Sequence, residues 1–178
     1  RNLVDRAAET VLLRHRAARL EDQLDAAYGI EGIIGESAGI RGVINQIRKV
    51  APSTLPVLVT GESGTGKELV AHELHRQRNR RLKLEMPNFT EKDHPYLAVN
   101  CGALSRTLLE SQLFGHKKGA FTGSSSDQDG VFIAAKRGTL FLDEITELDL
   151  DLQVKLLRAL QEKEVTPIGS TKALKMPT

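Results

Sequence analysis

The stretch "GESGTGKE", residues 61–68, decides the fold of this chain, because its Gly-x4-Gly-Lys spacing is typical of a phosphate-binding P-loop. The run before it, "LPVLVT" (residues 55–60), is short, apolar and rich in β-branched residues, which predicts a strand buried on both faces. The residues from Lys67 to about Arg78 predict a helix. A glycine-rich turn between a strand and a helix presents backbone N–H groups to phosphate oxygens.

Two positions of this loop have distinct expected roles. Lys67 supplies a positive charge for the β- and γ-phosphates of a nucleotide. Glu68 stands where most P-loops have Ser or Thr for Mg²⁺, which argues against small GTPases and simple kinases. The loop residues expected to bind nucleotide are Gly61, Glu62, Ser63, Gly64, Thr65, Gly66, Lys67 and Glu68.

A second acidic motif, "TLFLDE" (residues 139–144), predicts another strand that ends in two adjacent carboxylates. Asp143 is suited to hold Mg²⁺, and Glu144 is suited to polarise an attacking water. Two carboxylates after a buried strand are costly unless a cation or another partner is present. With the P-loop, this pattern indicates hydrolysis of ATP rather than phosphoryl transfer to a substrate.

The rest of the chain alternates helices and strands, which predicts an α/β fold with a parallel sheet. The expected elements are a helix over residues 40–51 with Ile40, Val43, Ile44, Ile47 and Val50 on one face, a strand over 96–100, a helix over 105–114 with Ser105 as N-cap, a helix from 149 to about 164 with Leu152, Leu156, Leu157 and Leu160 facing inward, and a β-hairpin around Gly169.

Residues 2–27 predict one long helix without Gly or Pro. Small and apolar residues recur at intervals of 4, 3, 4 and 3, namely Leu13, Ala17, Leu20, Leu24 and Ala27. This pattern fits equally a short linker that dimerises and an amphipathic helix packed on a neighbouring domain.

Composition limits the function classes. The net charge of +2 and the absence of Trp give no support to nucleic-acid binding by this segment. The single cysteine, Cys101, fits a reducing cytosol, and neither a membrane span nor a signal peptide is expected. The chain starts without Met inside a helical pattern, so we expect a piece of a longer protein.

Six quoted pieces together resemble one family, the AAA+ activators of sigma-54 RNA polymerase, which are NtrC-like bacterial enhancer-binding proteins. They are "IIGES" (33–37), "GESGTGKE" (61–68), "VNCGAL" (99–104), "ESQLFGHKKGAFTGS" (110–124), "GTLFLDEI" (138–145) and "LDLQVKLLRALQEKEVTPIGSTK" (150–172). The resemblance implies an α/β, parallel-sheet P-loop NTPase (AAA+) core that stops before the C-terminal strands and helical lid. The expected division is a linker helix over 1–29 and the N-terminal part of the AAA+ domain over 30–178.

The resemblance also implies roles at matching positions, with ATP and Mg²⁺ as cofactors. Ile33, Ile34 and Gly35 would lie near the adenine. The catalytic residues would be Lys67, Asn100, Asp143 and Glu144, with Asn100 restraining Glu144 until the nucleotide state changes. Gly119, Ala120, Phe121, Thr122, Gly123 and Ser124 would form a mobile loop that engages sigma-54, with Phe121 either at the contact tip or tucked back onto its own domain.

Partners follow from the same resemblance. We expect sigma-54 RNA polymerase holoenzyme, copies of the chain itself in a ring that is usually a hexamer, and enhancer DNA through a C-terminal domain outside this chain. The helix over 1–29 is similar to linkers that follow receiver domains, which implies a cytoplasmic bacterial response regulator of a two-component system. Because the segments for the sensor Asn and the Arg fingers are missing, we expect little ATPase activity from this fragment alone.

The chain departs from the family pattern at three places. Ser124 replaces the usual Ala, a change that we expect to be tolerated. Ile133 replaces a common Glu, so a charged contact at the base of the loop is expected to be missing. The longer, basic segment from Arg76 to Pro95 is expected to be a solvated surface insertion rather than a DNA or RNA contact.

Two other functions fit parts of the sequence. One is an AAA+ remodeller unconnected with transcription, and the other is a scaffold fragment with a decayed ATPase. The "GAFTG" motif (residues 119–123) argues against the first, and the intact Lys67, Asn100, Asp143 and Glu144 argue against the second.

Overall fold

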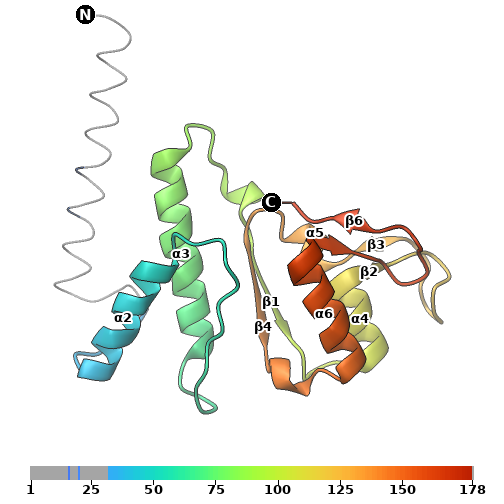
Figure 1. Cartoon of the computed structure of the whole chain (residues 1–178), viewed down its shortest axis with the longest axis horizontal. Helices are drawn as coiled ribbons and strands as arrows, with labels where there is room; N and C mark the ends of the chain where they lie inside the picture. The colour runs from blue at the N-terminus through green and yellow to red at the C-terminus, as the bar shows by residue number, and fades with distance from the viewer. Residues whose placement is uncertain (1–15, 17–19, 21–31, 178) are drawn as a thin grey trace, which may run out of the picture. The chain divides into compact units, whose positions relative to one another are not determined.

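The computed structural model describes residues 16, 20 and 32–177. The chain divides into two compact units, residues 1–90 and 91–178, and each is described by itself (Figure 1). The predicted linker helix and its seam lie outside the described residues, except for Arg16 and Leu20, which are helical. Within the described part, no helix is both long and apolar enough to cross a membrane.

From residue 32 onward, the first unit is built from the helices α2 (Ala38–Val50) and α3 (Lys67–Glu85). The Ser37 side chain caps α2 by accepting a hydrogen bond from the Ile40 N–H at 3.3 Å. Four of the five residues predicted for the apolar face of α2 lie in the core of this unit, whereas the fifth, Val50, is half-buried outside it. The buried residues are Ile33, Ile44 and Ile47, and Ile40, Val43, Val70 and Leu74 pack against them.

The predicted strand over residues 55–60 is wrong. This segment has no regular secondary structure, and Leu55, Val57 and Leu58 are exposed. A strand needs a neighbour for its backbone N–H and C=O groups, and the described residues of the first unit contain no β-strand that could pair with this segment. The β-branched composition of the run was therefore not enough to make it a strand.

Helix α3 continues beyond the predicted end near Arg78 and takes up much of the basic segment. The carboxylate of Glu73 is buried and accepts hydrogen bonds from Arg76 at 2.8 Å and Gln77 at 2.7 Å. Arg81 pairs with Glu85 at 2.6 Å, one turn further along. Several basic side chains of this segment therefore have partners within the helix.

The second unit is organised around two parallel strands, β1 (Tyr96–Asn100) and β4 (Thr139–Asp143). The other helices are η1 (Glu91–Asp93), α4 (Arg106–Phe114), α5 (Val131–Ala134), η2 (Ile145–Glu147) and α6 (Leu150–Glu162). Helices α4 and α6 lie side by side (Figure 1). The core consists of buried side chains from β1, the helices and the C-terminal hairpin, namely Val99, Cys101, Leu109, Leu113, Phe114, Phe132, Leu148, Leu152, Leu156, Ala159 and Val165.

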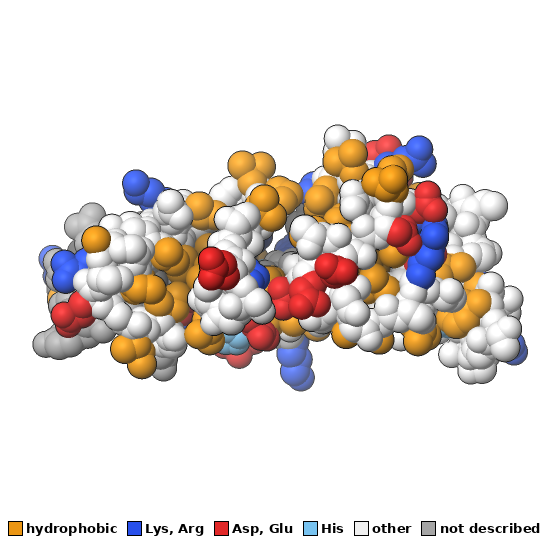
Figure 2. Space-filling view, turned by 90° about the horizontal axis from the view of Figure 1, so that it is seen from below, with side chains coloured by type: hydrophobic (Ala, Val, Ile, Leu, Met, Phe, Trp, Pro, Cys, Tyr) orange, Lys and Arg blue, Asp and Glu red, His pale blue; other side chains and the backbone are white. Residues whose placement is uncertain are grey.

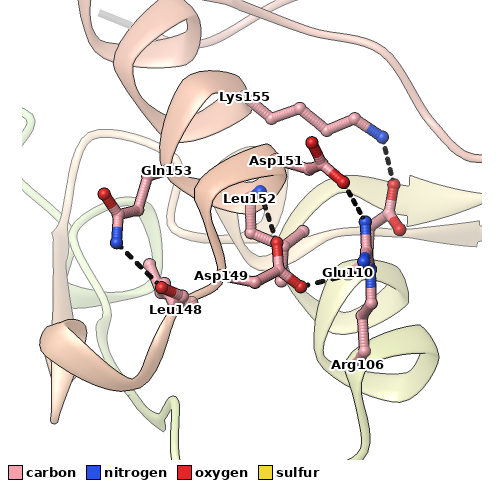
Figure 3. Close-up of polar contacts among 8 residues, drawn as sticks. All are labelled: Arg106, Glu110, Leu148, Asp149, Asp151, Leu152, Gln153 and Lys155. Atoms are coloured by element: carbon pink, nitrogen blue, oxygen red, sulfur yellow. Dashed lines mark hydrogen bonds and ion pairs between the residues drawn. The ribbon is translucent and has the colours of Figure 1, made fainter.

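Polar contacts join α4 to the start of α6 (Figure 3). Arg106 pairs with Asp149 at 3.2 Å and with Asp151 at 2.6 Å, and Lys155 pairs with Glu110. Asp149 also caps α6 by accepting a hydrogen bond from the backbone N–H of the third residue of the helix at 2.9 Å. The beginning of α6 is thus positioned both by its own cap and by its neighbour helix.

One of the four inward residues predicted for α6 is wrong. Leu152 and Leu156 are buried and Leu160 packs against the core, but Leu157 is 53% exposed. Leu157 lies on the opposite face of the helix with Leu150 and Val154, both also exposed.

Figure 2 shows hydrophobic side chains at several places on the surface viewed there.

Two short hairpins complete the second unit. Strands β2 (Gly115–His116) and β3 (Gln128–Asp129) pair antiparallel at the base of the loop that contains Phe121. Strands β5 (Glu164–Val165) and β6 (Leu174–Lys175) form the predicted C-terminal hairpin, which is therefore confirmed. An isolated bridge joins His116 to Ile168, so the turn of the C-terminal hairpin lies beside β2.

The turn before β4 supplies a test of this packing. A Cβ at Gly138 would overlap the backbone carbonyl oxygen of Pro95, which cannot move without disturbing the start of β1. We expect Gly138→Ala to lower the free energy of unfolding by about 1–3 kcal/mol, measured by urea denaturation. The matched change Gly42→Ala, in the interior of α2 with open space around it, should instead raise it by about 0.5–1 kcal/mol. Equal effects of the two changes would contradict the close approach at Gly138.

Candidate functional site

The P-loop turns directly into α3 through two glycines in the left-handed region of backbone space. Gly64 has φ +78° and Gly66 has φ +86°, backbone angles that residues other than glycine rarely adopt. Gly61 has no room for a side chain either, because a Cβ there would lie 2.8 Å from the Thr65 hydroxyl oxygen. The glycine spacing of the motif is thus required by the local geometry.

Side chains of the P-loop close it on itself. The Lys67 ammonium donates hydrogen bonds to the carbonyl oxygens of Gly61 at 3.2 Å and Glu62 at 2.8 Å. The Thr65 hydroxyl donates to the same Glu62 carbonyl at 2.8 Å. Among the described residues, Lys67 has no carboxylate within ion-pair distance, so no protein anion competes for its charge. Residues 61–65 are exposed.

The three residues predicted to lie near the adenine differ in their exposure to solvent and in their packing. Ile33 is buried in the core of the first unit and serves packing. Ile34 is 95% exposed, which leaves its apolar side chain available for contact with a flat ring. Gly35 has φ +151°, and a Cβ there would lie 3.2 Å from the Ile40 side chain.

In the second unit, the structure brings Asn100, Asp143 and Glu144 together at the carboxyl ends of the two parallel strands. Asn100 lies opposite Asp143 in the strand register, and the Cys101 N–H donates to the Asp143 carbonyl at 3.0 Å. The Asp143 carboxylate accepts from the Glu144 N–H at 2.9 Å. Glu144 itself has φ +52°, a strained conformation for a residue with a side chain.

Gly102 lies between these polar side chains. Its N–H donates to the Asn100 side-chain oxygen at 2.8 Å. A Cβ at Gly102 would lie 2.6 Å from a carboxylate oxygen of Glu144 and 3.5 Å from the same Asn100 oxygen. The absent side chain therefore allows Asn100 and Glu144 to approach one backbone segment from two sides.

The loop over residues 119–124 is folded back rather than extended. The Phe121 ring is half-buried and lies edge-to-face on His116, with 5.0 Å between ring centroids and 66° between planes. Thr122 and Gly123 are exposed at the tip. Of the two predicted arrangements for Phe121, the structure has the tucked one.

An ion pair closes the base of this loop. Lys117 pairs with Asp127 at 2.6 Å, and the Lys118 N–H donates to the other Asp127 oxygen at 2.8 Å. These contacts hold the pKa of Asp127 below its ordinary value, chiefly through the hydrogen bond from Lys117. Ile133 packs against the core instead. The base of the loop therefore has an ion pair, formed by Lys117 and Asp127, and residue 133 takes no part in it.

The family described as "Sigma-54 interaction domain" matches residues 33–178, which include the P-loop, the strand ends and the folded loop. The chain belongs to the sigma-54 interaction domain family. The predicted resemblance and the α/β P-loop AAA+ core are therefore confirmed.

The relatives of this sigma-54 interaction domain that we compared are regulatory proteins by name. The chain is 44% identical to a Nif-specific regulatory protein of Herbaspirillum seropedicae over 96% of its own length and 29% of that protein. It is 50% identical to the response regulator protein PilR of Pseudomonas aeruginosa over 77% of its length and 28% of that protein. The crystal structure of NtrX from Brucella abortus in complex with ATP aligns with a TM-score of 0.66 at 26% identity, covering 93% of this chain and 33% of that one.

The residues of this sigma-54 interaction domain fit ATP and Mg²⁺. The P-loop offers an ammonium without a carboxylate partner next to the beginning of a helix. In the part of the chain that the structure describes, no three potential metal ligands of the His, Cys, Asp or Glu type cluster together. Mg²⁺ commonly binds through one or two carboxylates, waters and substrate phosphates, and a single carboxylate such as that of Asp143 fits this mode of binding. The P-loop and the Asp143 site belong to separate units and are described separately.

Sequence reasoning missed two residues of this site and the hydrogen bonds of a third. Gly102 is one, although a glycine soon after a strand that ends in Asn could have drawn attention. His116 is the second, since its contact with Phe121 joins residues whose spacing fits no periodic pattern. Ser124 was predicted as part of the loop, but its bonds were not: its hydroxyl donates to the Phe121 carbonyl at 2.7 Å and accepts from the Phe121 N–H at 3.1 Å. An alanine could form neither bond.

The carboxylates also act on a neighbouring thiol, which can be measured. Burial raises the pKa of Cys101, and the negative charges of Asp143 and Glu144 raise it further because they disfavour the thiolate. We expect Asp143→Asn and Glu144→Gln each to lower the pKa of the thiol, so that alkylation of Cys101 by iodoacetamide begins at a lower pH. The readout is the alkylated peptide, quantified by mass spectrometry across a pH series.

The control for this measurement is Glu147→Gln, which removes a nearby carboxylate that does not contribute to the shift of Cys101. Its alkylation profile should match that of the parent protein. An unchanged profile in Asp143→Asn would show that this carboxylate does not lie close enough to influence the thiol.

Proposed function

We propose that this chain is the nucleotide-binding part of a transcription activator that hydrolyses ATP and uses it to remodel closed complexes of sigma-54 RNA polymerase. The observation that carries the proposal is the match of residues 33–178 to the sigma-54 interaction domain. The folded loop with its exposed Thr122 supports it, since this loop lies within the matched region. The chain spans less than a third of the length of the Nif-specific regulator and of PilR, so the whole protein's activity is inferred.

The proposed roles toward ATP and Mg²⁺ are assigned within each unit by itself, to the P-loop in the first and to Asp143 in the second. Lys67 and the N–H groups of the P-loop bind the β- and γ-phosphates of ATP, and the exposed Ile34 with Gly35 contacts the adenine. Asp143 holds Mg²⁺, which neutralises charge on the phosphates when it is bound. The support from relatives is the ATP complex of NtrX.

Glu144 is the proposed general base. Its carboxylate is exposed, whereas Asp143 already accepts a hydrogen bond from the backbone N–H of Glu144. An exposed carboxylate can accept a proton from an attacking water. Asn100 is held beside it through Gly102, and we infer that it positions Glu144 rather than reacting itself.

The proposed partners follow the names of the relatives. The loop from Gly119 to Ser124 binds sigma-54 RNA polymerase, and the intact protein acts as a ring, which we infer to be a hexamer, on promoters to which a separate domain directs it. PilR is by name a response regulator, which supports control by a two-component system. The division at residues 29 and 30 into linker and AAA+ domain is part of this proposal.

The nucleotide site is tested with two substitutions in the intact protein. Lys67→Ala should weaken ATP binding roughly 10- to 150-fold, because a hydrogen bond to a charged group contributes about 1.5–3 kcal/mol. Glu144→Gln should leave ATP bound but slow hydrolysis roughly 10²- to 10⁴-fold, the typical contribution of a general base. Fluorescent-nucleotide titration and phosphate release measure the two effects.

The matched control is Lys83→Ala, which removes a lysine near the other end of the same helix. Its ATP affinity should equal that of the parent protein. If Lys67→Ala binds ATP as tightly as Lys83→Ala, the loop is not the phosphate site.

The sigma-54 loop is tested separately. Phe121→Ala should weaken capture of sigma-54 RNA polymerase, in the presence of a transition-state nucleotide analogue, by at least roughly 30-fold if this ring is an interface anchor of about 2 kcal/mol. Ser126→Ala, an exposed change just beyond the loop, should capture as the parent does. Failure of the parent protein to retain the polymerase under any nucleotide condition would rule out the proposed partner.

A further inference from the structure

The arrangement that holds Phe121 has two parts, one for the ring and one for the backbone. The ring lies against His116, and that imidazole is itself fixed, because it is buried and its Nδ1 lies 2.7 Å from the Ser111 hydroxyl on α4. Phe121 therefore packs against a buried imidazole that is itself held in place by a side chain of α4.

The backbone part depends on one side chain, Ser124. Its hydroxyl donates to the Phe121 carbonyl at 2.7 Å and accepts from the Phe121 N–H at 3.1 Å. Its own N–H also donates to the Phe121 carbonyl at 3.1 Å, and its carbonyl accepts from the Gly119 N–H at 2.9 Å. Residues 119–124 are thereby closed around Ser124, which is only 8% exposed.

The hydroxyl bonds occur together with an arrangement in which Thr122, rather than the Phe121 ring, is exposed to solvent. While both backbone groups of Phe121 are bonded to Ser124, the ring stays half-buried on His116 and the exposed tip is Thr122. To present the ring, the loop must release the Phe121 N–H and carbonyl from the hydroxyl. The net effect of each such bond on an equilibrium is roughly 2- to 10-fold, so the populations of the tucked and presented arrangements can differ by little.

We propose that Ser124 is a positioning residue, which holds Phe121 back in the free protein and so sets how readily the loop presents this ring to sigma-54 RNA polymerase. The inference rests on the proposed function of the loop. An alanine at this position would keep the backbone bonds of residue 124 but leave the Phe121 N–H without its hydroxyl acceptor. The presented arrangement then becomes easier to reach.

The test compares three variants of the intact protein. Ser124→Ala removes the hydroxyl, Ser124→Thr keeps it, and Ser125→Ala removes the hydroxyl of the exposed neighbour. The rate of hydrogen–deuterium exchange of the peptide around Phe121, measured without nucleotide, reports how stably the loop is hydrogen-bonded. We expect roughly 2- to 10-fold faster exchange in Ser124→Ala, as for the loss of one hydrogen bond, with Ser125→Ala equal to the parent and Ser124→Thr closer to the parent than to Ser124→Ala.

A second readout distinguishes positioning from a purely structural role. Capture of sigma-54 RNA polymerase without nucleotide should rise in Ser124→Ala by about the same factor as exchange, and Ser124→Thr should reverse the rise. Urea denaturation of each variant identifies any global loss of stability, which would accelerate exchange throughout the chain rather than in this peptide alone.

The outcomes separate the inference from the function on which it rests. Unchanged exchange in Ser124→Ala overturns the inference, and so does faster exchange with capture that stays at the parent's level. If no variant and not even the parent captures the polymerase while exchange still rises, the proposed partner is wrong and the hold of Ser124 on Phe121 stands.

Discussion

The second unit depends on the parallel pairing of β1 with β4. This register sets Asn100 opposite Asp143 and makes both strands end at the same edge, so that Glu144 follows directly. The left-handed backbone of Glu144 and the missing side chain of Gly102 then allow two polar side chains to approach one backbone segment. Without this pairing, three residues separated by up to 44 positions in sequence would have no reason to meet.

A different pair of strands, β2 and β3, forms the base of the loop that contains Phe121, and this loop is fixed by hydrogen bonds. Its base is closed by Lys117 and Asp127, and its interior is closed by Ser124. The turn of the C-terminal hairpin lies beside it, since the Lys117 N–H donates to the Ile168 carbonyl at 2.9 Å. A loop with many glycines can thus have a defined resting arrangement, because hydrogen bonds offset the entropy that those glycines lose.

Local signals predicted the elements that satisfy their own backbone groups. Helix α2 and the glycine turn of the P-loop appear where their patterns placed them, because capping and left-handed glycines act over a few residues. The strand predicted over residues 55–60 was wrong because a strand needs a neighbouring strand for its backbone hydrogen bonds. The inward orientation predicted for Leu157 was also wrong. Leu156 and Leu157 are adjacent in sequence but point about 100° apart on a helix, and the packing of the folded chain decides which one faces the core.

The sequence alone determined the chemistry of this protein: a P-loop ending in Lys67, adjacent carboxylates at Asp143 and Glu144, and a glycine-bounded loop with an aromatic residue, all with family-specific spacing. Tertiary structure alone decided how these groups are held. His116 meets Phe121, and the hydroxyl of Ser124 turns inward, through contacts that depend on the path of the folded chain. Residue identity records which bonds a side chain can make, whereas the fold determines which partners come within reach of it.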